Sequence, residues 1–124
     1  MKVKCGTDII EVSRIRECIE DLGDKFLNRV YTEKEIEYCN GKKNVKYEHF
    51  AARFAAKEAI FKAVSDLLND KYEISWKNLE VVNDKNGRPQ VNFIGKSFDE
   101  IISIDLSLSH LKEYAVASCT VLIK

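Results

Sequence analysis

The chain has 124 residues, a length that suits one domain burying roughly two thirds of its unfolded surface without a metal or a disulfide. Twenty Lys and Arg residues balance twenty Asp and Glu residues, and a formal net charge of zero argues against nucleic acid or an acidic membrane surface as a partner. With 45% hydrophobic and 32% charged residues, the composition excludes a disordered chain. We therefore expect one continuous domain, residues 1–124, whose partners are recognised by local groups of charges.

The N-terminal and cysteine patterns exclude further classes. In "MKVKCGTDIIEVSRIREC" the apolar residues are interrupted by Asp8 and Glu11, so this segment forms neither a signal-peptide core nor a membrane span. The cysteines form no C-x-x-C pair and have no neighbouring histidine, which argues against zinc ligation. They are Cys5, Cys18, Cys39 and Cys119. We expect a cytoplasmic protein in which these thiols are reduced and mainly buried.

The first elements expected along the chain are a strand and a helix. Residues 2–10 form a short β-branched run with a glycine, which predicts a strand whose end presents Asp8. From Ser13 the apolar residues recur at spacings of three and four, and Gly23 supplies a stop, so a helix is expected here. Residues 24–32 are expected to continue as a short helical piece.

Another helix is predicted to begin at a capping box. Thr32 and Glu35 have the Thr-x-x-Glu spacing in which each side chain bonds the other residue's backbone amide. The polar and basic residues 40–48 then predict an exposed loop. A long helix of about five turns is expected from Glu48 to Leu68.

The second half of the chain is predicted to be rich in strands. Two β-rich stretches within residues 78–94 flank the pair Asn86-Gly87, and this pair favours the positive φ angles of a tight hairpin turn. Residues 96–102 are expected to form a brief helix.

The last two strands complete the expected fold. Within residues 103–110, Ile104, Leu106 and Leu108 alternate with polar residues, which is the pattern of a half-buried strand. After a turn, residues 114–123 form the last strand. The sequence therefore predicts an α+β fold, in which helices pack on one side of an antiparallel sheet.

The long predicted helix carries full charges in apolar surroundings. Within residues 50–63, "FAARFAAKEAIFKA", helix geometry places Glu58 one turn below Lys62 and Arg53 one turn below Lys57. A Glu four residues before a Lys, as in Glu58 and Lys62, is an ordinary way to stabilise an exposed helix face. However, nearly every side of this helix is apolar, and a carboxylate beside buried surface costs several kcal/mol unless it is paired or bound to a metal. A site for a phosphate and a metal ion is the alternative use of the same charges.

Asp8 and His110 leave similar choices open. Asp8 is either a cap for the helix that follows or a carboxylate ligand for Mg²⁺, which takes one or two protein carboxylates. The spacing alone does not show that Asp8 meets Glu58. A histidine at the end of a strand is most often a hydrogen-bonded surface residue. Because Ser109 and His110 are adjacent in a strand, they point to opposite faces, and a serine-hydrolase pair is excluded.

Five segments together resemble a known family, the holo-[acyl-carrier-protein] synthases, which are the small phosphopantetheinyl transferases. The likeness runs in order over essentially the whole chain. Two motifs are particularly specific: G-x-D near the N-terminus, and F-x-x-K-E-x-x-x-K, here Phe54, Lys57, Glu58 and Lys62. The segments are "GTDIIEVSRI" (6–15), "FLNRVYTEKEI" (26–36), "FAARFAAKEAIFKA" (50–63), "ISWKNLEVVNDKNGRPQV" (74–91) and "SLSHLKEYA" (107–115).

The resemblance implies transfer of the phosphopantetheine arm of coenzyme A to a serine of apo acyl carrier protein, with release of adenosine 3′,5′-bisphosphate. By the same resemblance, Asp8 and Glu58 hold Mg²⁺, and Lys62 neutralises phosphate oxygens and the leaving group. Arg53 and His110 are the implied contacts to coenzyme A phosphates. Since the carrier protein supplies the nucleophile, the chain needs none of its own, and Glu58 is the implied base, acting directly or through a metal-bound water.

The resemblance also implies a docking surface and an assembly. The carrier protein is acidic along its recognition helix, so a basic patch is expected to receive it. Arg14 matches the family position for this role, with Phe26 and Arg29 extending the surface. The implied fold has a three-stranded antiparallel sheet flanked by helices. It forms a homotrimer with active sites between subunits.

One departure from the family pattern bears on coenzyme A. Where the family continues with a Gly-Thr-Gly-type segment, this chain has Val64 to Leu67, including the acidic Asp66. Leu111 also replaces the usual threonine after the histidine. These changes leave a second hypothesis open, a non-catalytic module that binds acyl carrier protein, although Asp8, Glu58 and Lys62 are all present.

Overall fold

A computed structural model describes all residues, 1–124, as an α+β fold, which confirms the predicted class. The first half contains β1 (Lys2–Glu11), α1 (Val12–Leu22), α2 (Asp24–Val30), α3 (Glu33–Asn40), the 3-10 helix η1 (Lys43–Val45) and α4 (Lys46–Ala63). The second half contains η2 (Ser65–Leu67), η3 (Trp76–Asn78), β2 (Leu79–Asn83), β3 (Pro89–Phe93), β4 (Ile101–His110) and β5 (Tyr114–Ile123).

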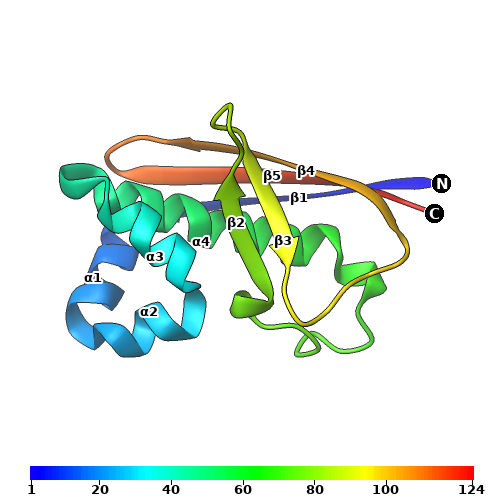
Figure 1. Cartoon of the computed structure of the whole chain (residues 1–124), viewed down its shortest axis with the longest axis horizontal. Coiled ribbons are helices and arrows are strands. Elements are labelled where there is room, and N and C mark those ends of the chain that lie inside the picture. Colours follow the sequence, from blue (N-terminus) through cyan, green and yellow to red (C-terminus); the bar gives the residue numbers. More distant parts are fainter.

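β5 is the central strand of a three-stranded antiparallel sheet in the order β1-β5-β4. Gly6 of β1 and Leu106 of β4 both pair with Cys119 of β5. α4 runs along one face of this sheet, against β1 and β5, while α1 to α3 gather at one end of the molecule (Figure 1). On the other face of β1, Val3 and Ile9 are exposed. The prediction of three main strands with helices on one side is confirmed.

Gly6 sets how closely α4 approaches β1. A Cβ atom at this position would lie 2.1 Å from the carbonyl oxygen of Ala59 and 2.9 Å from the amide nitrogen of Ala63. No real Cβ fits at such distances, so glycine is required for the contact. The close approach brings Asp8, two residues further along β1, beside the C-terminal half of α4.

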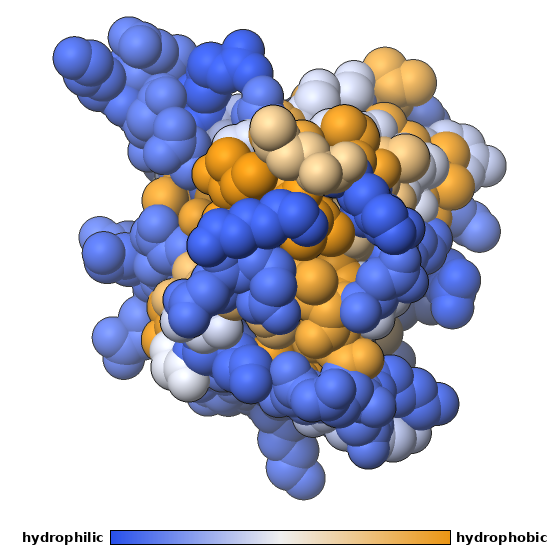
Figure 2. Space-filling view, turned by 90° about the vertical axis from the view of Figure 1, so that its right-hand side faces the viewer, coloured by the Kyte–Doolittle hydropathy of each residue, from blue (hydrophilic) through white to orange (hydrophobic).

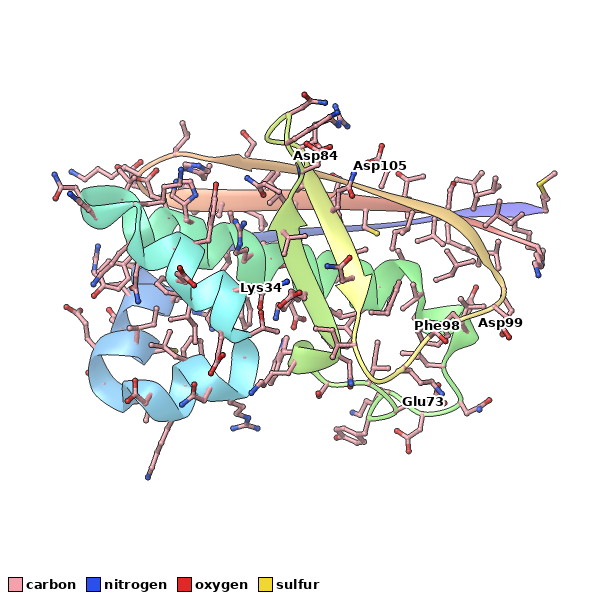
Figure 3. All side chains as sticks on the ribbon, in the orientation of Figure 1. Lys34, Glu73, Asp84, Phe98, Asp99 and Asp105 are labelled. Atoms are coloured by element: carbon pink, nitrogen blue, oxygen red, sulfur yellow. The ribbon has the colours of Figure 1, made fainter.

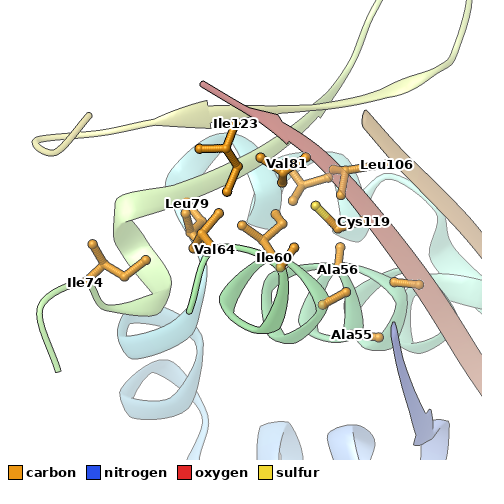
Figure 4. Close-up of a cluster of buried hydrophobic side chains, with 14 residues drawn as sticks. Ala55, Ala56, Ile60, Val64, Ile74, Leu79, Val81, Leu106, Cys119 and Ile123 are labelled. Carbon is orange, nitrogen blue, oxygen red and sulfur yellow. The ribbon is translucent and has the colours of Figure 1, made fainter. Parts of the chain in front are cut away.

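The main hydrophobic core lies between α4, the sheet and the β2–β3 hairpin (Figure 4). Alanines on α4 allow this close packing. The labelled members of the core are Ala55, Ala56, Ile60, Val64, Ile74, Leu79, Val81, Leu106, Cys119 and Ile123. A second core lies under α1 to α3 and includes Tyr31, whose hydroxyl donates to the carbonyl of Phe50 at 2.7 Å.

The predicted hairpin of β2 and β3 is present, and it forms a two-stranded sheet separate from the main one. Gly87 takes a positive φ of 82° in its turn, which favours glycine. Arg88, in the hairpin loop, lies 3.8 Å from the carboxylate of Asp105 on β4. Figure 3 shows Asp84 at the same tip, near Asp105. The hairpin therefore extends across α4 to the far edge of the sheet.

One predicted helix end and one predicted helix are wrong. α4 ends at Ala63 rather than Leu68, because the chain tightens into η2 immediately after the helix. Residues 96–102 form no helix, and Ile101 already begins β4. Phe98 in this segment packs edge-on against Phe93, with ring centroids 5.6 Å apart. The spacing of apolar residues within this short segment carries no information about such a tertiary contact.

All four cysteines are free, as predicted, but only two are buried. Burial raises the pKa of the Cys39 and Cys119 thiols to about 12. Cys5 is exposed and Cys18 is partly exposed, so the expectation of mainly buried thiols is wrong for half of them.

The surface has both hydrophilic and hydrophobic regions. At the end of the molecule that carries both chain termini, Figure 2 shows a recess of hydrophobic surface bordered by hydrophilic side chains. None of the helices combines the length and the apolar character needed to cross a bilayer.

Candidate active site

Asp8 and Lys62 meet where β1 crosses the end of α4. The Lys62 ammonium donates to the Asp8 Oδ1 atom at 3.3 Å and to the carbonyl oxygen of Thr7 at 2.8 Å. An ammonium has three donors, so one is left for a further acceptor. Asp8 lies inside β1 rather than at its end, and α1 has no side-chain cap. The interpretation of Asp8 as a helix cap is therefore wrong.

Asp8 and Glu58 line the same pocket, which has a volume of about 380 Å³. Arg14 and Phe26 line it too, so four of the predicted site residues converge there. The structure contains no group of three or more His, Cys, Asp or Glu side chains suited to a metal. Two carboxylates in one pocket nevertheless fit Mg²⁺, because this ion usually leaves its other positions to water and substrate phosphate.

A larger pocket of about 620 Å³ lies on the other side of Glu58. It is formed by the end of α4 and the following chain, including Ser65 and Tyr72, and by Arg29 of α2. Glu58 and Trp76 are the two residues common to both pockets. The indole N–H of Trp76 donates to the Glu58 Oε1 atom at 2.7 Å. This hydrogen-bonded pair therefore forms the wall between the pockets.

The buried Lys57 has a structural role that the sequence left open. Its side chain is 0% exposed, and its ammonium donates to the Glu35 carboxylate at 2.7 Å, to the carbonyl of Val30 at 2.6 Å and to the carbonyl of Trp76 at 3.0 Å. All three donors are thus used. Burial lowers the pKa of the Lys57 ammonium, and the adjacent Glu35 carboxylate acts in the opposite direction.

Glu35 joins this lysine to two further elements. The predicted capping box is present, with the Thr32 amide donating to Glu35 Oε1 at 2.8 Å. The other carboxylate oxygen accepts from the backbone amide of Val81 at 2.8 Å. α3, α4 and β2 therefore meet at one buried carboxylate. The i, i+4 pair of Glu58 and Lys62, one of the two interpretations left open by the sequence, is not among the ion pairs of the structure, because Glu58 bonds Trp76 and Lys62 bonds Asp8.

Arg53 and His110 lie apart from the Asp8 pocket. Arg53 is 2% exposed, with its guanidinium 4.0 Å from the Tyr38 ring centroid and a bond to Asn83 at 3.2 Å. Its Nε atom is buried and has no partner. The His110 Nδ1 atom lies 2.9 Å from the Glu48 carboxylate. Neither residue lines the two pockets, so within one chain the structure does not bring them to the other predicted site residues.

His49 belongs to this second group of residues, with its ring 4.8 Å from that of His110. Burial is the main cause that lowers the pKa of His49 from an ordinary 6.5 to about 4. Neighbouring cationic groups lower it further and one carboxylate opposes them. These neighbours are His110, Lys42 and Arg53, with Glu48 in opposition.

The predicted docking helices are not uniformly basic. From Val12 to Val30, four basic residues are matched by four acidic ones, namely Arg14, Arg16, Lys25 and Arg29 against Glu17, Glu20, Asp21 and Asp24. Positive charge is instead local: Arg14 lines the smaller pocket, and the Arg29 guanidinium lies 5.8 Å from the Trp76 ring centroid. The expected basic patch is thus reduced to two arginines beside the wall between the pockets.

Sequence reasoning missed Trp76 and left Lys57 without a role. Trp76 is the only tryptophan of the chain, and it lies just before a predicted strand, where a bulky indole needs a partner for its N–H. Lys57 stands among alanines and aromatic residues, which is a signal of a buried charge. Neither signal identifies the partner, because the partners are distant in sequence. Glu35 lies 22 residues from Lys57, and Glu58 lies 18 residues from Trp76.

Comparisons with known proteins agree over nearly the whole chain. Residues 4–119 match the 4′-phosphopantetheinyl transferase superfamily. The holo-[acyl-carrier-protein] synthase of Ruminiclostridium cellulolyticum is 43% identical, covering 94% of this chain and 90% of the relative. A Bacillus anthracis holo-(acyl-carrier-protein) synthase in complex with CoA (3′,5′-ADP) is 40% identical, with a TM-score of 0.76 over 95% of this chain and 94% of the other. A Chronobacterium ammoniagenes ACPS–CoA complex has a TM-score of 0.85 at 25% identity, covering 100% and 99%.

Proposed function

Because the chain belongs to the 4′-phosphopantetheinyl transferase superfamily, and within it to the holo-[acyl-carrier-protein] synthases, we propose that it transfers phosphopantetheine from coenzyme A to apo acyl carrier protein. The acceptor is a serine of the carrier, and the second product is adenosine 3′,5′-bisphosphate. The observation that carries this proposal is the convergence of Asp8 and Glu58 on one pocket, with the Lys62 ammonium on Asp8.

Asp8, Glu58 and Lys62 each have a proposed part in the reaction. The serine oxygen attacks the phosphorus attached to the pantetheine, and the bond from this phosphorus to the leaving bisphosphate breaks while the serine proton passes to a base. Lys62 neutralises charge on the phosphate oxygens through its unused donor. Glu58 takes the proton with the carboxylate oxygen that Trp76 leaves free, directly or through a water.

Asp8 and Glu58 are also the proposed ligands of Mg²⁺. The ion, when bound, supplies positive charge that offsets the pyrophosphate oxygens of coenzyme A. Two carboxylates suit this mode because substrate and water complete the coordination. Arg14, Phe26 and Arg29 are the proposed contacts to the carrier protein, and Arg14 lines the smaller pocket while Arg29 lines the larger one.

We propose that the enzyme works as a homotrimer with active sites between subunits. His110, a proposed contact to a coenzyme A phosphate, lies outside the Asp8 pocket of its own chain. Arg53, the other contact that the resemblance implies, is only 2% exposed, so it would reach a phosphate only after its guanidinium leaves the Tyr38 ring. A neighbouring chain would bring His110 to the Asp8 pocket. Two inactive variants, Asp8→Asn and His110→Ala, should then recover activity when they are co-assembled, because mixed trimers contain some sites with neither substitution. Without recovery, both groups must act within one chain.

The central test is a mass measurement on the acceptor. Apo acyl carrier protein incubated with coenzyme A, Mg²⁺ and the enzyme should gain the mass of one phosphopantetheine, and chelation of Mg²⁺ should stop the gain. Glu58→Ala should abolish it, whereas Glu37→Ala, at an exposed carboxylate of α3, should not. An acceptor that stays unmodified under all conditions, or product formation that survives Glu58→Ala, would contradict the proposal.

The non-catalytic alternative depends on the segment after α4. There Asp66 forms an ion pair with Lys4 of β1 at 2.6 Å, in place of the glycine segment of the family. A carrier-binding module without turnover would bind the carrier protein but form no product. Because Asp8, Glu58 and Lys62 retain the arrangement described above, the transferase is the function that we favour.

A further inference from the structure

Trp76 is held at two points by consecutive residues of α4. Its carbonyl accepts a hydrogen bond from the buried Lys57 ammonium at 3.0 Å, and its indole N–H donates to Glu58 Oε1 at 2.7 Å. The ring lies near that of Phe54, with centroids 6.0 Å apart, and under the Arg29 guanidinium. Backbone, ring face and ring edge of Trp76 are therefore all engaged.

We propose that Trp76 is a positioning residue for Glu58. A glutamate side chain at the edge of a pocket rotates about three bonds, so its carboxylate adopts many orientations. The indole N–H occupies one oxygen and leaves the other, Oε2, without a protein partner. The Glu58 carboxylate is thereby held in one orientation, with a chosen oxygen presented for metal or proton.

The anchoring of Trp76 extends this constraint into the interior. Lys57 connects the Trp76 carbonyl to Glu35 and to the end of α2 at Val30. The indole is consequently positioned by a buried ion pair rather than by a mobile loop. A charged carboxylate that accepts from a fixed N–H also makes a stronger hydrogen bond than a neutral acceptor does.

The location of Glu58 and Trp76 suggests why a fixed orientation of the Glu58 carboxylate matters for function. Glu58 and Trp76 separate the pocket that contains Asp8 from the larger pocket after α4. Rotation of the carboxylate would alter both pockets together. A merely structural indole could instead bond any nearby carbonyl or water, whereas this one is bonded to the carboxylate with the proposed catalytic role.

The substitution Trp76→Phe tests this inference, which rests on the proposed function. Phenylalanine keeps a six-membered aromatic ring and the carbonyl that accepts from Lys57, and it removes the N–H together with the five-membered part of the indole. Partners that orient a metal ligand typically contribute 10- to 100-fold to affinity or activity. We expect Mn²⁺ binding in the presence of coenzyme A, followed by the paramagnetic resonance of free Mn²⁺, to weaken about ten-fold. The turnover rate should fall similarly, while the KM for coenzyme A changes less than two-fold.

A second measurement uses the wild-type tryptophan, which is the only one in the chain. Its fluorescence reports the contact with Glu58 directly. Glu58→Gln keeps an oxygen that accepts from the indole and should leave the emission maximum unchanged, whereas Glu58→Ala should shift it. This comparison holds even where Trp76→Phe fails to fold.

The outcomes separate this inference from the proposed function. Wild-type protein that neither binds Mn²⁺ nor modifies the acceptor would overturn both. Active wild-type protein, together with a folded Trp76→Phe variant whose Mn²⁺ affinity and turnover stay within two-fold, would overturn the role of Trp76 alone. Identical emission from Glu58→Gln and Glu58→Ala would overturn the contact itself.

Discussion

Replacement of Lys57 by methionine should destabilise the protein strongly, although the two side chains have similar lengths. The Lys57 ammonium and the Glu35 carboxylate are both 0% exposed and lie 2.7 Å apart. Methionine leaves Glu35 buried without a countercharge, with only the backbone amides of Thr32 and Val81 as donors. The carbonyls of Val30 and Trp76 also lose their donor. The substitution therefore changes electrostatics far more than packing.

The magnitude follows from the cost of an uncompensated buried charge. Removing one partner of a buried ion pair costs about 3–5 kcal/mol, and this range includes the loss of the associated hydrogen bonds. For a domain of this size, each kcal/mol lowers the melting temperature by about 3–5 °C, so we expect a decrease of about 10–25 °C. A second substitution, Glu35→Gln, should recover part of this loss, because an amide carries no charge and its oxygen still accepts from a backbone N–H.

The assay is urea unfolding at one fixed protein concentration, with Lys62→Met as the matched control. Lys62 is on the same helix, but its side chain is 55% exposed and its contact with Asp8 is 3.3 Å. Exposed pairs contribute about 0–1 kcal/mol, so Lys62→Met should leave stability nearly unchanged. In the mass assay the order reverses: Lys62→Met should remove the gain in mass while the protein stays folded.

A Lys57→Met variant within about 1 kcal/mol of the wild type would refute this reasoning, since it falls well below the range for a buried pair. The same conclusion would follow if Glu35→Gln, added to Lys57→Met, produced no recovery. Loss of stability in Lys62→Met equal to that in Lys57→Met would show that burial does not distinguish the two lysines.

Three further substitutions give separate checks. Gly6→Ala places a Cβ atom 2.1 Å from the carbonyl oxygen of Ala59. Thermal melting should show that the free energy of unfolding decreases by about 1–3 kcal/mol or more, and activity should fall in parallel. The pKa of His49 is about 4 in the folded protein and 6.5 in the unfolded chain. As the pH decreases from 6.5 to about 4, the unfolded chain therefore binds the proton before the folded protein does, and the free energy of unfolding falls. Urea unfolding at pH 7 and pH 4.5 should show a smaller decrease for His49→Gln than for the wild type; an equal decrease would assign the effect to other groups. Asp66→Asn removes an exposed negative charge from the segment where the family has glycines, so steady-state kinetics should give a lower KM for coenzyme A, and a higher KM would show that the ion pair with Lys4 assists binding.

The sequence alone determined most of the local structure. Alternation predicted the strands, the spacing from Ser13 to Gly23 predicted α1, and the Thr32–Glu35 box predicted the start of α3. Each of these depends on neighbours within a few residues, which a linear pattern contains. The motifs likewise sufficed to select Asp8 and Glu58, and the structure places both in one pocket.

Only the tertiary structure decided which group each charge meets. Helix geometry fixes the direction of a side chain on α4, but the partner depends on the segment that packs there: Glu35 for Lys57, β1 for Lys62 and Trp76 for Glu58. Because contacts between segments distant in sequence are absent from a linear pattern, the end of α4 was predicted wrongly and the role of Trp76 was missed. Arg53 and His110 show this limit most clearly, because the structure of one chain leaves both residues outside the pocket that contains Asp8 and Glu58.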